Sequence, residues 1–180
     1  MTASELNKEP VGGPWPACPF QELELWFEEA LSKDEVLPEA AALATTDGQG
    51  MPDVRMVLVK TRGPQGFFFY TNLGSPKAKA LEANPVAALL FHWKSLARQV
   101  RVRGRVLPVD EGTADTYFAS RARESQCAAW ASAQSQPLDA GEGLAEKMAA
   151  VAQRYPDGPV PRPPFWGGYR LIPEAIELWR

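Results

Sequence analysis

The sequence predicts a mainly β domain with some α structure, in which antiparallel strands form a β-barrel and a few peripheral helices pack outside it. Two observations support this prediction. Short apolar or alternating runs recur with turn residues between them, and a few runs of helical periodicity interrupt these strands. An open α+β sheet fits the same local pattern, so the residues alone leave both arrangements open.

At 180 residues the chain is the size of one ordinary domain and is long enough to bury a sizeable core. Hydrophobic residues make up 45% and charged residues 23%, which argues against disorder. The net charge of −3 lacks the basic excess of a nucleic-acid-binding protein. No apolar run approaches the roughly 18–20 residues that span a bilayer, and the N-terminus has no signal pattern, so we expect a cytoplasmic protein.

The chain offers few residues for metal binding or nucleophilic catalysis. Its two cysteines, Cys18 and Cys127, lie far apart in unlike contexts, which indicates neither a disulfide framework nor a zinc site. The single histidine, His92, has no neighbouring carboxylate to orient it as a base, so we interpret it as a packed or surface residue. We predict no metal site and no catalytic residue, and expect any chemistry to come from a cofactor.

The first third of the chain predicts an arm, a helix and a hairpin. Residues 1–18 are rich in Pro, Gly and small polar residues and predict a flexible arm, which leaves 19–180 as a single domain. An amphipathic helix is predicted over 20–31, because large apolar residues recur there at helical spacing: Phe20, Leu23, Phe27 and Leu31. Residues 40–46 predict a strand and 47–50 a hairpin turn.

The hairpin of residues 55–71 is the centre of the predicted fold. Its pattern predicts a strand over 55–60, a turn over 63–66 and an aromatic strand over 67–70. Arg55 and Lys60 each lie beside a run that should be buried, where an unpaired charge is costly. Each therefore needs an anionic partner, which is either a protein carboxylate or a ligand phosphate.

Residues 75–84 predict a short helix, with Ser75 as N-cap and Pro76 at the first helical position. Lys77 lies in the first turn, where backbone N–H groups can hold an anion. A capped surface helix with a solvated lysine explains these residues equally well.

Two further strands are predicted over 85–93 and 98–107. In the second, valines alternate with Gln99, Arg101, Arg103 and Arg105. Gly104 interrupts this alternation, and the strand has one apolar and one strongly basic face. The basic face is either solvated or meets an anionic ligand or a partner subunit.

Residues 113–130 predict a helix on which Tyr117, Arg121 and Ser125 follow one stripe at i, i+4 and i+8. A phenol, a guanidinium and a hydroxyl are three donors suited to phosphate, although chance placement explains such a triplet as well. The rest of the chain predicts a polar loop over 131–137, a helix over 143–155 and two strands over 165–171 and 176–180. The expected inward face of the 143–155 helix is Leu144, Met148, Val151 and Ala152.

Six segments, in their order and spacing, resemble the pyridoxamine 5′-phosphate oxidase family over roughly residues 19–180. They are 55–60, 69–75, 98–100, 117–126, 133–135 and 162–168. Any one of them is a weak signal, but six in register are highly specific. The resemblance implies an antiparallel, Greek-key-like FMN-binding split β-barrel that works as a homodimer with FMN at its interface.

The resemblance also implies site residues. Around FMN it places Arg55, Met56, Val57, Leu58, Val59, Lys60, Tyr70, Thr71, Lys77, Gln99, Gln134, Ser135 and Trp179. At the phosphate of the substrate it places Lys60, Tyr117, Arg121 and Ser125. The odd separation of Arg55 and Lys60 puts them on opposite faces of a regular strand. Either this strand is bent or bulged, or the two phosphates lie on different sides of it.

The activity that the resemblance implies is the oxidation of pyridoxamine or pyridoxine 5′-phosphate, two forms of vitamin B6, to pyridoxal 5′-phosphate. Molecular oxygen is the acceptor and hydrogen peroxide a product. Protein groups would need only to position the substrate carbon over the flavin and to neutralise charge.

The sequence departs from the family pattern in three places. The pattern continues past Trp179 with an Arg-x-His segment and a further arginine, whereas this sequence ends at Arg180. Pro76 replaces the usual arginine before the flavin-phosphate lysine, and the N-terminal arm lacks the Arg/Tyr segment that can cover the substrate. We expect either a fragment or shortened form of a working oxidase, or a member that binds FMN or pyridoxal 5′-phosphate with little or no turnover. A third interpretation is a related flavoenzyme with another substrate. The stripe of Tyr117, Arg121 and Ser125 argues against it, because a substrate without phosphate would not use these donors.

Overall fold

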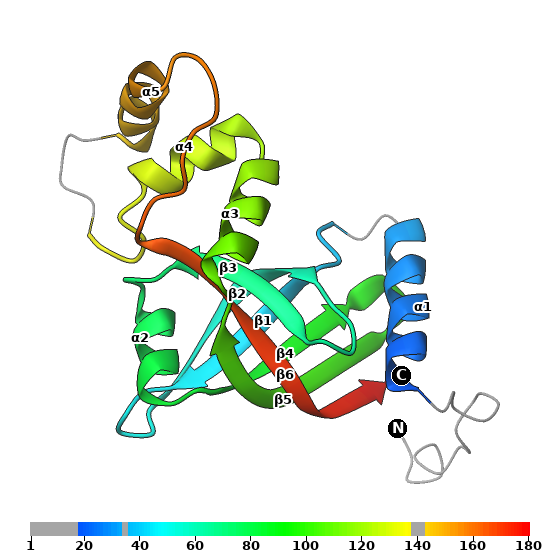
Figure 1. Ribbon diagram of the computed structural model, residues 1–180. Helices are drawn as coiled ribbons and strands as arrows, with labels where there is room; N and C mark the ends of the chain where they lie inside the picture. The colour runs from blue at the N-terminus through cyan, green and yellow to red at the C-terminus, as the bar shows by residue number, and fades with distance from the viewer. Residues whose placement is uncertain (1–17, 34–35, 138–142) are drawn as a thin grey trace, which may run out of the picture.

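A computed structural model describes residues 18–33, 36–137 and 143–180, and its strands close into an antiparallel barrel (Figure 1). The strands are β1 (Ala40–Thr46), β2 (Pro52–Thr61), β3 (Phe67–Asn72), β4 (Val86–Trp93), β5 (Arg98–Pro108) and β6 (Trp166–Trp179). Their order around the barrel is β1-β2-β3-β6-β5-β4. The closed barrel that the sequence predicted is therefore confirmed, and the alternative of an open sheet is wrong. Residues 1–17 of the expected arm lie outside the described residues.

The helices lie around the barrel (Figure 1). They are α1 (Pro19–Ser32), α2 (Pro76–Ala83), α3 (Glu111–Ser120), α4 (Arg123–Ala131) and α5 (Leu144–Arg154), with a short 3₁₀ turn at Lys94–Leu96. α1 lies at one end of the barrel, and α3 to α5 form a lobe at the other end (Figure 1). α2 packs on the side of the barrel away from α1 (Figure 1). None of the helices described is both long and apolar enough to cross a membrane.

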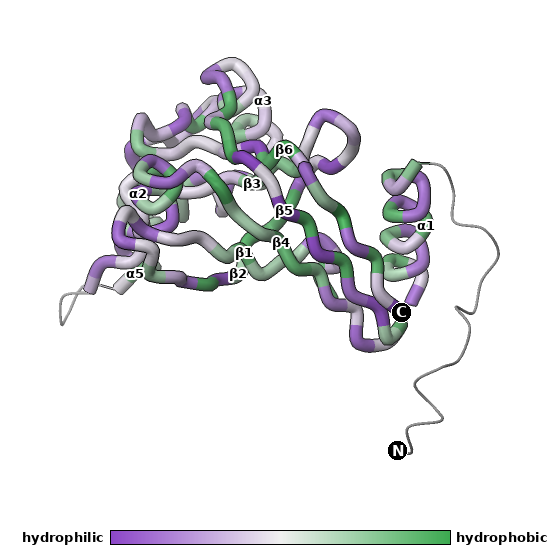
Figure 2. The backbone as a smooth tube through the Cα atoms, turned by 90° about the horizontal axis from the view of Figure 1, so that it is seen from below, coloured by the Kyte–Doolittle hydropathy of each residue, from purple (hydrophilic) through white to green (hydrophobic). Residues whose placement is uncertain are grey.

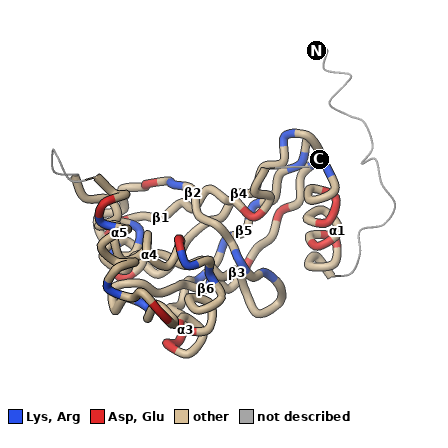
Figure 3. The backbone as a smooth tube through the Cα atoms, turned by 90° about the horizontal axis from the view of Figure 1, so that it is seen from above, with Lys and Arg blue, Asp and Glu red and all other residues tan. Residues whose placement is uncertain are grey.

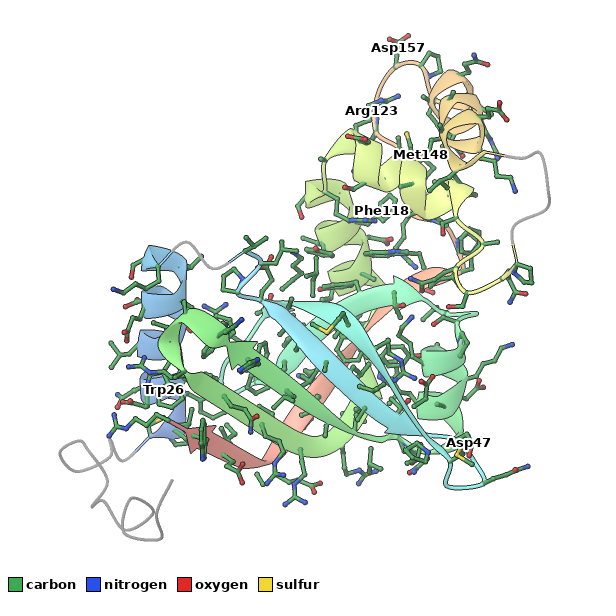
Figure 4. All side chains as sticks on the ribbon, turned by 180° about the vertical axis from the view of Figure 1, so that it is seen from behind. Trp26, Asp47, Phe118, Arg123, Met148 and Asp157 are labelled. Carbon is green, nitrogen blue, oxygen red and sulfur yellow. The ribbon has the colours of Figure 1, made fainter. Side chains whose placement is uncertain are left out.

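The barrel has Greek-key connectivity. β1, β2 and β3 follow one another through hairpins, and β4 returns to pair with the free edge of β1. Asp47 lies at the tip of the first hairpin, where its carboxylate accepts bonds of 2.9 Å from the backbone N–H groups of Gln49 and Met51 (Figure 4). The turn predicted over 47–50 is therefore confirmed.

Side chains that alternate along the strands fill the barrel interior. Polar and apolar segments accordingly follow one another along β5 and β6 (Figure 2). The fully buried residues include Leu43, Val59, Phe67, Phe69, Leu89, Phe91, Val100 and Val102. Burying each such side chain contributes roughly 1.5–3 kcal/mol, which makes this interior the main source of stability for the barrel.

α1 covers one end of the barrel with Leu23, Trp26, Phe27 and Ala30. The ring of Phe27 packs edge-on against Trp93, with 4.7 Å between the centroids. Leu31, which the sequence analysis placed on the buried stripe, is 59% exposed, so that prediction is wrong. A stripe of 3.6 residues per turn passes from Leu23 through Trp26 and Phe27 to Ala30 and leaves Leu31 outside it. Acidic residues lie on the outer side of this helix (Figure 3).

The two strands predicted at the end of the chain are one continuous strand, β6. The register shifts between Arg103, which faces Ala175, and Gly104, which faces Pro173. Glu174 is therefore an extra residue, and β6 bends at this bulge instead of ending. Pro173 has no N–H to donate, which suits a position at a bulge.

The helix predicted over 113–130 is also different in the structure. α3 ends at Ser120, Arg121 and Ala122 are extended, and α4 begins at Arg123. Gln126 stabilises the break, because its buried side-chain amide donates to the carbonyl oxygens of Phe118 and Ala119 at 2.9 and 3.3 Å. These bonds satisfy carbonyl groups that the end of α3 leaves open.

α5 packs mainly against α4, and Met148 lies between the two helices (Figure 4). Met148 and Val151 are half-buried, whereas Leu144 and Ala152 are exposed. The inward face predicted for this helix is therefore wrong at Leu144 and Ala152. Because α5 packs against one short helix, α4, and not against the barrel core, only a narrow stripe of its surface is buried.

Candidate functional site

A cavity of about 380 Å³ lies between the outer surface of the barrel and the lobe. Its walls come from β2, β3, the start of β6, α2, α3 and α4 with the segments that follow them. Among the predicted site residues, it is lined by Met56, Val57, Leu58, Lys60, Tyr70, Thr71, Lys77, Tyr117, Arg121 and Gln134. Segments far apart in the sequence thus converge on one site.

Lys77 is a buried cation with neutral partners. Its side chain belongs to a residue only 6% exposed, and its Nζ donates to Thr71 Oγ1 and Gln134 Oε1, both at 3.1 Å. Burial lowers the pKa of Lys77 below its ordinary value, the nearby charge of Arg55 lowers it further, and Asp53 acts in the opposite direction. A cation held in this way is stabilised by an anion that comes from outside the chain.

The start of α2 adds donors beside Lys77. Ser75 is the N-cap residue, as predicted, but its side chain makes no capping bond, and its buried hydroxyl has no partner among the described residues. Pro76 occupies the first helical position. The hydroxyl and the free N–H groups of the first turn suit the oxygens of a phosphate group.

Lys60 and Arg121 form a second cationic group in the same cavity. Lys60 Nζ lies 2.9 Å from Glu39 Oε1. Arg121 Nη1 is buried without a hydrogen-bond partner in the part of the chain that the structure describes. Burial lowers the pKa of Arg121 from its ordinary value, although an arginine remains charged at neutral pH. A buried guanidinium N–H without an acceptor fits an incoming anion.

Three aromatic rings stack at this end of the cavity. Tyr70 stacks on Tyr117 and on Trp166, with centroid distances of 3.9 and 5.5 Å and interplanar angles of 16° and 6°. Burial raises the pKa of Tyr70, and the neighbouring Tyr117 and Asp110 raise it further. Tyr70 is therefore neutral at physiological pH and presents a flat surface rather than a charge.

Trp166 was missed in the sequence analysis as a site residue, although it lies within the segment 162–168 that carries the family resemblance. Its ring lies 5.0 Å from the guanidinium carbon of Arg121, and its carbonyl oxygen accepts a 2.6 Å bond from Arg162. Arg162 also pairs with Asp115 of α3 at 2.5 Å, so α3 and the start of β6 are joined beside the cavity. The other lining residues that were missed are Asn72, Ala128, Ala129 and Ser132.

Six predicted site residues do not line the cavity: Arg55, Val59, Gln99, Ser125, Ser135 and Trp179. Val59 is fully buried in the barrel core. Arg55 donates to Leu43 O at 3.0 Å and to Thr45 Oγ1 at 2.8 Å, and it pairs with Asp53 at 2.5 Å. Arg55 is thus already paired within the chain, although its charge lowers the pKa of Lys77.

Gln99 and Trp179 face each other where β5 begins and β6 ends. The adjacent Arg98 pairs with Glu29 of α1, so these two residues lie at the α1 end of the barrel. β6 runs from the lobe to this end (Figure 1). Within one chain, the structure therefore does not bring Gln99 and Trp179 to the cavity. Trp179 is 59% exposed and lies on the surface.

The spacing of Arg55 and Lys60 has a simple structural consequence. Along β2 the burial alternates, so Lys60 lies on the outer face with Met56 and Leu58, opposite to the face of Arg55. The register irregularity with β3 falls between Val59 and Thr61. The strand is regular between Arg55 and Val59, so the cations Arg55 and Lys60 point to opposite sides of β2 and do not share one anion site.

Comparisons with known proteins identify related sequences and structures. The profile of the family described as pyridoxamine 5′-phosphate oxidase matches residues 27–155. A pyridoxine/pyridoxamine 5′-phosphate oxidase of Caulobacter vibrioides is 54% identical over 162 residues, which are 90% of this chain and 73% of the relative. One from Rhodopseudomonas palustris is 52% identical over 161 residues, which are 89% and 76% of the two chains.

Two solved structures share the fold. PhzG from Burkholderia lata, in complex with tetrahydrophenazine-1-carboxylic acid, has a TM-score of 0.86 and 28% identity over 94% of this chain and 85% of PhzG. A pyridoxamine 5′-phosphate oxidase-related, FMN-binding protein of Nostoc punctiforme has a TM-score of 0.69 at 13% identity, over 91% and 86% of the two chains. Given the matched profile and the identity to the curated relatives, the chain belongs to the pyridoxamine 5′-phosphate oxidase family.

Proposed function

We propose that the protein is an FMN-dependent oxidase that converts pyridoxamine or pyridoxine 5′-phosphate to pyridoxal 5′-phosphate, with O₂ as acceptor and H₂O₂ as product. The observation that carries the proposal is one cavity lined by two separate groups of cationic residues, Lys77 with its neighbours and Lys60 with Arg121. Such a cavity suits two phosphorylated molecules, a cofactor and a substrate. Family membership supports FMN as the cofactor and a B6 phosphate as the substrate.

The first cationic group fits the phosphate of FMN. Lys77 supplies a buried positive charge with only neutral acceptors, and Ser75 supplies a buried hydroxyl that has no partner among the described residues. Arg55 adds charge nearby. A phosphate at this point would satisfy Lys77 and Ser75, which is the outcome that buried polar groups require.

The second cationic group fits the phosphate of the substrate. Arg121 would donate its open N–H, Lys60 would contribute charge, and Tyr117 and Ser125 lie on the two helices that flank Arg121. The guanidinium of Arg121 lies over the ring of Trp166, and Trp166 in turn stacks on Tyr70. Flavin, when bound, supplies the acceptor for a hydride. The work left to the chain is to hold the two molecules in contact and to exclude water.

A second copy of the chain would complete the site. Gln99 and Trp179 belong to the implied flavin residues, yet they lie at the end of the barrel away from the cavity. The outer face of β2 exposes Val54, Met56 and Leu58. In the pairing of β1 with β2, each of these residues lies opposite an alanine of β1. This apolar face supports a homodimer in which each copy supplies Gln99 and Trp179 to the cavity of the other.

The test is a visible spectrum of the purified protein, followed by pyridoxine 5′-phosphate with and without air. We expect a flavin spectrum that the substrate bleaches without air, and peroxide when air is admitted. A flavin spectrum that the substrate leaves unchanged would favour a binding protein with little turnover. Absence of any flavin after FMN is added would contradict the proposal.

The likeness to PhzG supports a second candidate, a flavoenzyme of the same fold that oxidises an aromatic substrate without a phosphate. The two candidates differ at Arg121, because a substrate without phosphate has no need of its open N–H. We expect Arg121→Ala to raise the KM for pyridoxine 5′-phosphate at least about tenfold, the loss of one charged hydrogen bond to phosphate. Arg154→Ala, which changes an exposed arginine of the lobe outside the cavity, serves as the control. An unchanged KM in Arg121→Ala would favour the second candidate.

A further inference from the structure

The two cations of the second group differ in one respect that the proposed function does not use. Arg121 has an N–H open to a ligand, whereas the ammonium of Lys60 is already paired with Glu39 at 2.9 Å. The side chains of Lys60 and Glu39 are 29% and 25% exposed, so solvent screens this ion pair only in part. A phosphate that approaches Lys60 must therefore share it with a carboxylate.

Glu39 is held beside Lys60 by the backbone. Its carbonyl oxygen accepts a 2.9 Å bond from Val59 N, next to Lys60 in the chain. The carbonyl oxygen of the preceding Pro38 accepts a 3.0 Å bond from the buried indole of Trp93. With two anchors to the barrel, the backbone of Glu39 has little freedom to carry its carboxylate away when an anion arrives.

Glu39 is ionised at neutral pH. Burial alone raises the pKa of its carboxyl group, but the hydrogen bond and charge of Lys60, with a smaller effect of Arg62, hold that pKa below its ordinary value. The negative charge thus lies at contact distance from a cation that lines the cavity.

We propose that Glu39 is an internal competitor for phosphate at Lys60, which weakens the binding of phosphorylated substrate and product and so favours product release. This inference rests on the proposed function. Glu39 acts through Lys60 and is a positioning residue. A bound phosphate gains Lys60 only as Glu39 gives it up, and the carboxylate then repels the phosphate across the same few ångströms.

The expected size of the effect follows from the ion pair. A partly exposed pair of this kind changes an equilibrium constant by up to about fivefold. Glu39→Gln keeps the shape of the side chain and an oxygen that accepts from Lys60, but it removes the charge. We expect it to lower the Kd of pyridoxal 5′-phosphate about three- to fivefold, with a similar fall in the KM for pyridoxine 5′-phosphate.

The experiment measures these constants for the FMN-loaded protein, with pyridoxal as the matched ligand that lacks phosphate. The Kd of pyridoxal is expected to stay unchanged in Glu39→Gln. The control variant is Glu24→Gln, which removes the same charge at another place. Glu24 lies on α1, outside the cavity, and pairs with Arg62. Glu39→Ala removes the carboxylate altogether, and its Kd for pyridoxal 5′-phosphate is expected to fall as in Glu39→Gln.

The following results would overturn the inference. Pyridoxal 5′-phosphate that binds Glu39→Gln no more tightly than wild type would show that Glu39 does not compete. Equal tightening for pyridoxal, or in Glu24→Gln, would show that the phosphate at Lys60 is not the cause. If Glu39→Gln does not fold, Glu39→Ala that binds pyridoxal 5′-phosphate no more tightly than wild type overturns the inference. A wild-type protein that binds neither pyridoxal 5′-phosphate nor inorganic phosphate would contradict the proposed function as well.

Discussion

At the scale of single residues, Lys77 tests the assignment of the cofactor phosphate. Lys77→Met removes the buried cation and its hydrogen bonds to Thr71 and Gln134, while the bond from Thr71 Oγ1 to Gln134 Oε1 can remain. We expect FMN to bind about ten- to hundredfold more weakly, the value of a charged hydrogen bond to phosphate. Fluorescence titration of the apoprotein with FMN measures this change. Lys79→Met, which alters an exposed lysine of the same helix, is expected to bind FMN as the wild type does.

The pH dependence of FMN binding follows from the same lysine. Burial lowers the pKa of Lys77, so the apoprotein loses this proton at a lower pH than an exposed lysine would. A bound phosphate favours the charged form. FMN affinity should therefore be constant below the lowered pKa and fall as the pH rises through it. Lys77→Arg, whose guanidinium stays charged, should keep its affinity to higher pH, and parallel titration curves for the two proteins would contradict this.

Single residues also show where sequence reasoning about the site reached its limit. Lys60, Lys77 and Arg121 could be singled out as charges beside apolar runs or on a helix. The sequence could not show that Lys60 has a carboxylate at 2.9 Å while an N–H of Arg121 has no partner among the described residues. That difference depends on Glu39, which is 21 positions from Lys60 and meets it only when β1 pairs with β2.

At the scale of elements, Gly104 fixes the bend shared by β5 and β6. A Cβ at this position would lie 1.9 Å from the backbone carbonyl oxygen of Ile172. Since backbone cannot move aside as a flexible side chain does, Gly104→Ala must shift the bulge. We expect a loss of about 1–3 kcal/mol in the free energy of unfolding, measured by denaturant titration. In Gly48→Ala the new Cβ would meet only Ala83, at 3.7 Å, and a similar loss there would remove the argument.

The elements were predicted best where local pattern and tertiary contact agree. β1 and α2 match their expected ranges closely, since turn residues and an N-cap mark their ends. β6 and the α3–α4 break were missed because their causes are not local. Pro173 looks like a strand end until β5 supplies Gly104 opposite the bulge, and α3 ends where Gln126 reaches back to its carbonyl groups. The bulge and the helix break each depend on a residue distant in the sequence or on a neighbouring element, so the local sequence pattern does not predict them.

At the scale of the whole molecule, the proposed homodimer can be tested with Lys77 and Trp179, which lie apart in one chain. Lys77 lines the cavity beside the lobe, and Trp179 lies exposed at the α1 end of the same barrel. If each flavin site takes Lys77 from one copy and Trp179 from the other, the two residues can be lost separately. Lys77→Met and Trp179→Ala homodimers should then both bind FMN poorly, because every site in each of them carries a defect.

Mixing the two variants separates a shared site from an internal one. In a heterodimer of Lys77→Met and Trp179→Ala, one site would receive both defects and the other would receive neither. We therefore expect a tagged and purified heterodimer to bind about one FMN per dimer with wild-type affinity. Flavin absorbance against protein concentration measures this ratio. If both residues served the cavity of their own chain, both sites would stay defective and mixing would restore no binding, which would contradict the two-chain site.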